Sequence, residues 1–85
     1  MYTVHLAAFP QARHERLERV VHKHNRRLDH LARKALLHEV AAGRSQLVAR
    51  YVEAHAAHNA ARELELLGAT VVQGEDKAVP APEAA

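Results

Sequence analysis

The order of secondary structure is decided by residues 47–72, which read LVARYV (47–52), EAHAAHNAARELELL (53–67), G (68) and ATVV (69–72). The first and last segments are rich in Val, Tyr and Thr, residues typical of strands. The middle segment is rich in Ala, Leu and Glu, which favour helix. Gly68 stands where a helix needs a left-handed residue after its last turn. The stretch therefore predicts a strand, a helix of about four turns, a glycine stop and another strand.

The N-terminal half predicts one more strand and two helices. Residues 2–6, YTVHL, alternate along the chain and predict a strand, and Pro10 blocks its continuation. A helix is expected from Gln11 to about Asn25, and a second from Asp29, a residue type that caps helices, to Gly43. Neither Pro nor Gly interrupts residues 11–41, so a single long helix is the alternative.

Apolar residues recur at helical spacing in all three predicted helices. They are expected to form one buried face on each: Leu17, Val20, Val21, His24 and Leu28 on the first; Leu28, Leu31, Ala32, Ala35, Leu36 and Val40 on the second; Ala57, Ala60, Ala61, Leu64 and Leu67 on the third. The chain has only three aromatic residues, so the core must be built from Leu, Val and Ala.

The predicted order is β-α-α-β-α-β, an α+β fold in which helices cover one face of a three-stranded antiparallel sheet. At 85 residues the chain has room for one small domain, assigned to residues 1–73. Residues 74–85, GEDKAVPAPEAA, cannot bury a core and are predicted to form a disordered acidic and Pro/Ala-rich tail. A core of this size is usually marginal, so a partner or self-association would add stability.

The composition excludes several classes of protein. No cysteine is present, which rules out disulfides and thiolate metal sites. No apolar run approaches the ~20 residues of a membrane span and no signal-peptide pattern opens the chain, so a cytoplasmic protein is expected. Residues 1–50 carry ten Lys/Arg and four Asp/Glu (+6), whereas residues 51–85 carry two and six (−4). The basic half is therefore the expected surface for an acidic partner.

The closing segment of the domain resembles a known family. Val52, the fifteen residues after it and Gly68-Ala69-Thr70-Val71 are similar to the end of the C-terminal domain of the bacterial ribosomal stalk protein. In that family a helix of Ala, Leu and charged residues likewise ends in Gly-Ala before a short strand. Residues 2–6 are similar to its opening strand, and the resemblance covers roughly residues 2–73. It implies the same β-α-α-β-α-β order.

The same fold is shared by the adaptor that hands N-degron substrates to the Clp protease. Residues 36–40, LLHEV, followed by Gly43, are similar to that adaptor's helix before its second strand. The adaptor's Asn-Asp-Asp pocket entrance is replaced here by residues 7–10, AAFP, and the stalk family's glycine-containing turn by residues 25–31, NRRLDHL. What the two resemblances imply together is a small non-catalytic domain that docks on another protein.

The strongest functional signal in the residues themselves is a set of basic side chains. At about 100° per residue they share one arc beside the apolar stripe of the first helix: Arg13, Arg16, Arg19, Lys23, Arg26 and Arg27. Arg pairs bidentately with carboxylates, and such an arc also suits a phosphate backbone. A protein partner is predicted because no aromatic or glycine motif interleaves with the charges. The alternative is a solvated face that Glu15 and Glu18 partly neutralise.

Eight histidines are present, and His55 and His58 are three residues apart, a helical spacing at which they could chelate a divalent metal. No third ligand stands near them, so no metal and no cofactor is predicted. Scattered surface histidines and a pH-sensing role are the alternatives.

Ser45 is the only serine, without a nearby Asp, and there is no glycine-rich phosphate loop. A non-catalytic protein is expected.

The sequence therefore predicts an adaptor or accessory module that binds an acidic protein surface through its basic first helix. One alternative is a nucleic-acid or ribosome-associated accessory protein. The other is a homo-oligomeric scaffold, because the Ala-rich third helix would permit close helix contact.

Overall fold

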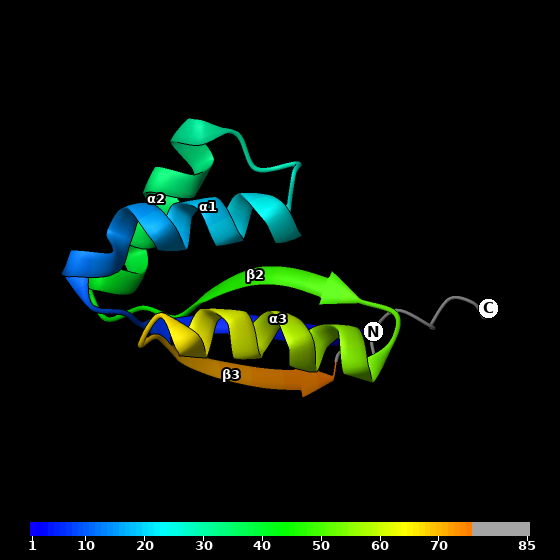
Figure 1. The fold of residues 1–85 in the computed structure, drawn as a ribbon. Helices are drawn as coiled ribbons and strands as arrows, with labels where there is room; N and C mark the ends of the chain where they lie inside the picture. The colour runs from blue at the N-terminus through cyan, green and yellow to red at the C-terminus, as the bar shows by residue number, and fades with distance from the viewer. Residues whose placement is uncertain (76–85) are drawn as a thin grey trace.

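The computed structural model describes residues 1–75 and has the element order β-α-α-β-α-β (Figure 1). The elements are strand β1 (Tyr2–Ala8), a 3-10 turn η1 (Gln11–Arg13), helix α1 (His14–His24), helix α2 (His30–Ala41), strand β2 (Gln46–Tyr51), helix α3 (Ala54–Leu66) and strand β3 (Thr70–Glu75). The predicted α+β class is confirmed. None of the helices in this part of the chain is long and apolar enough to cross a membrane.

The three strands form one antiparallel sheet in the order β2-β1-β3. Strand β1 is central and pairs with β2 from Tyr2 opposite Tyr51 to Leu6 opposite Gln46. On its other side it pairs with β3, from Tyr2 opposite Glu75 to Ala8 opposite Thr70. The two edge strands are thus parallel to each other, and α3 is the crossover that connects them, as parallel strands require.

The third strand is longer than the sequence predicts. Gly74 pairs with Thr3 and Glu75 with Tyr2, so the domain extends two residues beyond the predicted boundary at 73. A strand can pair through its backbone without apolar side chains. The polar composition of residues 74 and 75 therefore gave no sign that they extend the strand. The rest of the predicted tail, residues 76–85, lies outside the described residues.

Helix α3 lies along the sheet over β1, while α1 and α2 stack on the side of β2 (Figure 1). The largest fully buried side chains among residues 1–75 are all Leu or Val: Leu6, Leu17, Leu37, Leu64, Val4, Val21 and Val48. Small side chains bring α3 close to the sheet, since Ala57, Ala60 and Ala61 are at most 2% exposed. The predicted core of Leu, Val and Ala is confirmed. These alanines face the chain's own sheet and are not available for contact with a second copy.

Two glycines end helices as the sequence predicts. Gly43 after α2 and Gly68 after α3 have φ of 96° and 87°, in the left-handed region. At the end of α3 the Gly68 amide donates to the Glu65 carbonyl and the Ala69 amide to the Leu64 carbonyl. The Leu64 carbonyl also accepts from the Leu67 amide, so these bonds give carbonyl groups in the last turn of the helix their partners.

Residues 11–41 form two helices, which excludes the single long helix. Helix α1 ends at His24, where Asn25 has non-helical backbone angles (φ −144°, ψ 85°) and its side-chain amide donates to the Val48 carbonyl of β2 at 2.8 Å. Helix α2 begins after Asp29, whose carboxylate accepts from the Ala32 amide at 2.8 Å. The helix thus ends without a glycine, at a residue whose side chain contacts a strand that is distant in sequence.

The buried face of α2 differs from the prediction. Leu31 is 75% exposed and Ala35 is also exposed, whereas Leu36, Leu37 and Val40 are buried. The inward-facing spacing begins at Arg33 and continues through these three residues. Arg33 can occupy the first inward position because its guanidinium is hydrogen-bonded at the junction with α1, which the sequence pattern does not reveal.

Candidate functional site

The outer side of α1 carries exposed basic side chains. Arg16, Arg19 and Lys23 recur there at helical spacing over about 10 Å of helix axis, and Arg13 precedes them in η1. Leu17 and Val21 on the opposite side are completely buried, so packing fixes which side faces solvent. We call Arg13, Arg16, Arg19 and Lys23 the basic face of α1.

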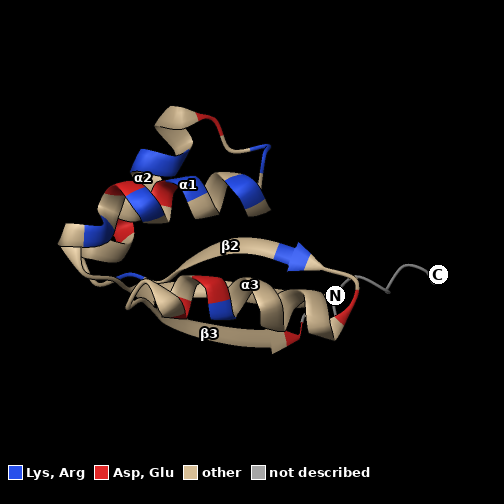
Figure 2. Cartoon of the chain, viewed as in Figure 1, with Lys and Arg blue, Asp and Glu red and all other residues tan. Residues whose placement is uncertain are grey.

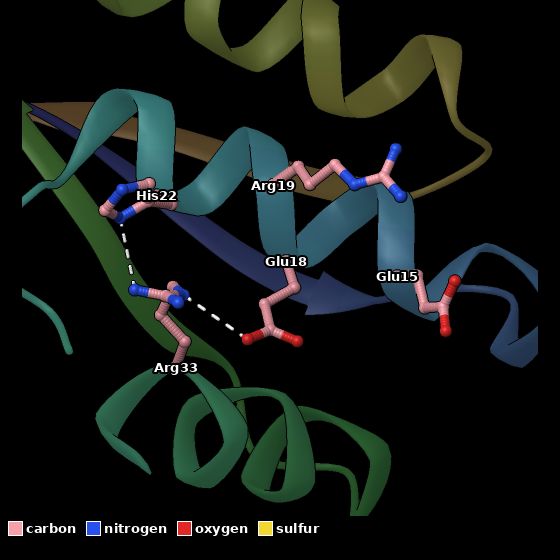
Figure 3. A pocket seen from close by; sticks show the side chains of 5 residues that line it. All are labelled: Glu15, Glu18, Arg19, His22 and Arg33. Carbon is pink, nitrogen blue, oxygen red and sulfur yellow. Dashed lines mark hydrogen bonds and ion pairs between the residues drawn. The ribbon is translucent and has the colours of Figure 1, made fainter. Parts of the chain in front are cut away.

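Of the two acidic residues of α1, Glu18 does not neutralise this face, because it is directed toward α2 (Figure 3), whereas Glu15 in the first turn is exposed. One Glu18 carboxylate oxygen lies 2.9 Å from His30 Nδ1 and 3.4 Å from Arg33 Nε. Partial burial raises the pKa of Glu18, but the hydrogen bonds from His30 and Arg33 outweigh it and hold the pKa below its ordinary value. Glu18 therefore stays charged at neutral pH.

Arg33 joins α1 and α2 through further hydrogen bonds. Its Nη1 lies 3.1 Å from His22 Nδ1 and donates to the Leu28 carbonyl at 2.8 Å. A hollow of about 350 Å³ opens here, lined by Glu15, Glu18, Arg19, His22 and Arg33. Figure 3 shows Arg19 extending away from the Glu18–Arg33 pair. Within this hollow Glu18 and Arg33 form an ion pair, whereas Arg13, Arg16 and Arg19 form no ion pair within residues 1–75.

Lys23 differs from the other basic residues because it belongs to the junction with α3. Its Nζ lies 2.9 Å from Glu63 Oε2, and His24 Nε2 lies 2.7 Å from Glu63 Oε1. The hydrogen bonds from Lys23 and then His24 hold the pKa of Glu63 below its ordinary value of 4.5. The His24 ring also meets Tyr51 edge-on, with ring centroids 6.2 Å apart. Burial, and secondly the charge of Glu63, raises the pKa of Tyr51.

We expect Glu63→Gln to lower the free energy of unfolding at neutral pH by about 1 kcal/mol or less, since the Glu63 side chain is 36% exposed. A carboxyl group with a lowered pKa stabilises the fold above its unfolded pKa and loses this effect as pH falls through the folded pKa. The difference between Glu63→Gln and the parent protein should therefore shrink below about pH 4.3. Urea unfolding followed by circular dichroism across this range measures it.

The control is Glu65→Gln, which removes an exposed carboxylate two residues along the same helix. It should change stability little at any pH. Equal pH dependence for the two variants would contradict a stabilising role for the Glu63 junction.

Arg26 and Arg27 do not share the helix face that the sequence predicts for them. Because α1 ends at His24, both lie in the turn between α1 and α2. Arg27 instead lines a second hollow, of about 430 Å³, together with Arg50 of β2. Figure 2 shows that Lys and Arg gather on α1, α2 and the turn between them, and also mark the end of β2. Arg50 was missed in the sequence because it is 23 residues from Arg27 and has no neighbouring cation.

The histidines do not converge on a metal site within residues 1–75. No group of three or more His, Cys, Asp or Glu side chains there is arranged to hold a metal ion. His55 and His58 are both exposed on α3, and His55 Nδ1 lies 3.6 Å from Glu53 Oε1. Histidines instead take part in the junctions of α1: His22 of α1 and His30 of α2 lie in the junction between these two helices, and His24 lies in the junction with α3.

Comparison with known proteins adds no identification. No protein-family model matches the chain, and no curated protein is significantly similar to it in sequence. The resemblance to the stalk and Clp-adaptor domains thus stays a prediction that depends on the residues quoted for it.

Proposed function

We propose that this protein is a non-catalytic interaction module that docks an acidic surface of another protein on the basic face of α1. The observation that supports the proposal is the placement of charge. Glu18, the acidic residue in the middle of α1, pairs with His30 and Arg33 on α2, while Arg16 and Arg19 remain exposed. Their guanidinium groups are charged at every physiological pH and suit carboxylates in bidentate geometry.

An acidic protein is favoured over single-stranded nucleic acid because stacking platforms are missing. All three aromatic side chains of the chain, Tyr2, Phe9 and Tyr51, are partly buried and pack against the core. Proteins that bind single strands usually present exposed aromatic rings beside their basic groups. The basic face of α1 offers charge and hydrogen bonds alone.

The test compares Arg19→Glu with Arg62→Glu, two charge reversals that change the net charge equally, and adds a double variant of the basic face. We expect Arg19→Glu to weaken binding of a fluorescent Asp/Glu-rich peptide, and Arg16→Glu combined with Arg19→Glu to weaken it by about tenfold or more, because attraction is replaced by repulsion. The matched control is Arg62→Glu, an exposed residue of α3, which should retain affinity. Amide chemical shifts induced by the peptide should centre on residues 13–23. Lys23 is left unchanged because its reversal would also break the Glu63 junction.

Two outcomes would contradict the proposal. One is equal weakening by Arg19→Glu and Arg62→Glu, which would mean that only net charge matters. The other is tighter binding of a DNA oligonucleotide than of the peptide, with an affinity that falls steeply as salt is added. Circular dichroism of each variant confirms that the fold persists.

A further inference from the structure

We propose that the outer edge of β3 is a self-association surface, to which a second copy of this chain adds its own β3 in the antiparallel direction. Strand β3 lies at one edge of the sheet, and within residues 1–75 its outer side pairs with no strand. Backbone amide and carbonyl groups on such an edge are a template for another strand. The basic face of α1 is on the side of β2 (Figure 1) and stays exposed in the pair.

The two edges of the sheet differ in how well they resist strand addition. At the edge formed by β2, Asn25 Nδ2 donates to the Val48 carbonyl, and Val48 is an extra residue in the register with β1. A bulge and a capped carbonyl both discourage the addition of a strand. Strand β3 has neither protection, because the register shift beside it falls at Ala7 of β1. Its residues, TVVQGE, also include no Lys or Pro.

The exposed side chain of Val72 favours a second copy as the added strand. Val72 is 53% exposed and pairs with His5 of β1. Val4 and Leu6, on either side of His5, are completely buried in the core. Because side chains alternate along a strand, His5 and Val72 project from the face of the sheet opposite to the helices. When two β3 strands pair about Val72, the two Val72 side chains lie directly opposite each other and bury apolar surface.

The position of α3 fits the same arrangement. Helix α3 packs on both β3 and β1, so two strand spacings of about 4.8 Å separate the α3 helices of the two copies, close to the distance at which helices pack. The flank of α3 that meets the second copy is opposite Glu63, which is bonded to α1. At 100° per residue this flank carries His58 and Glu65, both exposed. In antiparallel helices Glu65 of one copy lies near His58 of the other, a complementary but exposed pair that adds little energy.

Sedimentation equilibrium of the full chain tests the proposal. A contact through one strand and one helix flank is small, so we expect a monomer–dimer equilibrium with a dissociation constant on the order of 100 µM. Val72→Lys places two ammonium groups opposite each other and should raise this constant about tenfold or more. The matched control is Val52→Lys, which makes the same change at a valine that is 78% exposed and lies outside the strands. It should leave the association unchanged.

Amide resonances of the labelled protein locate the contact. Dilution should shift the amides of residues 70–75 and leave those of residues 13–23 in place. The Arg16→Glu, Arg19→Glu variant should associate like the parent protein, so failure of the proposed docking function and failure of this surface are distinguishable. A chain that stays monomeric up to about 1 mM would overturn the proposal and leave the edge to a strand of another protein. Dilution shifts that centre on another surface, or equal association of Val72→Lys and Val52→Lys, would overturn it too.

Discussion

Replacing Leu64 by alanine is expected to lower the free energy of unfolding by about 2–5 kcal/mol. Leu64 of α3 is completely buried, and it belongs to the same core as Leu17 and Val21 of α1. Its removal leaves a cavity between helix and sheet that small neighbours such as Ala60 and Ala61 cannot fill. In a domain of this size, such a loss is comparable with the whole stability.

The matched control is Leu66→Ala in the same helix. Leu66 is 74% exposed, so the same chemical change should cost little. Urea unfolding followed by circular dichroism measures both variants. Similar losses for the two would mean that α3 does not lie on the sheet through the face that contains Leu64.

The second large effect is expected at the end of α3, where Gly68→Ala should destabilise the protein by about 1–3 kcal/mol. Gly68 has a φ of 87°, a conformation that costs other residues about 1–2 kcal/mol. In addition, a Cβ at this position would lie 3.1 Å from Pro10 Cγ. The added methyl group therefore meets both backbone strain and the loop that leads into α1.

Gly43→Ala separates these two causes. Gly43 has a similar φ of 96°, but a Cβ there would meet nothing within 4 Å. It should show the backbone cost alone, so Gly68→Ala is expected to lose more stability than Gly43→Ala in thermal or urea unfolding. Equal losses would show that the Pro10 ring moves aside at no measurable cost.

Both predictions bear on the basic face of α1, because packing holds that face toward solvent. Leu17 and Val21 anchor α1 in the core, and the Glu63 junction ties its last turn to α3. Loosening either contact would change the spacing of Arg16 and Arg19 relative to a partner. Affinity for the acidic peptide should therefore be measured well below the melting temperature of each variant.

The sequence determined the element order, most helix ends and the composition of the core. These features depend on local properties: alternation in residues 2–6, helical spacing in α1 and α3, a capping Asp29, and glycines at positions that need a left-handed backbone. Each can be judged from a few neighbouring residues. The buried alanines of α3 were predicted for the same reason, since their spacing selects one face.

The tertiary structure alone decided which charges are paired and which lie together. At the break after His24 the Asn25 side chain contacts a β2 carbonyl, and this break removes Arg26 and Arg27 from the face of α1. Arg33 of α2 is directed inward, where it forms an ion pair with Glu18 of α1. Arg27 and Arg50 line the same hollow only because β2 lies beside the turn between α1 and α2. Helical and strand periodicity specify which face of an element is apolar, but the partner of a long charged side chain depends on distances between elements that no local pattern contains.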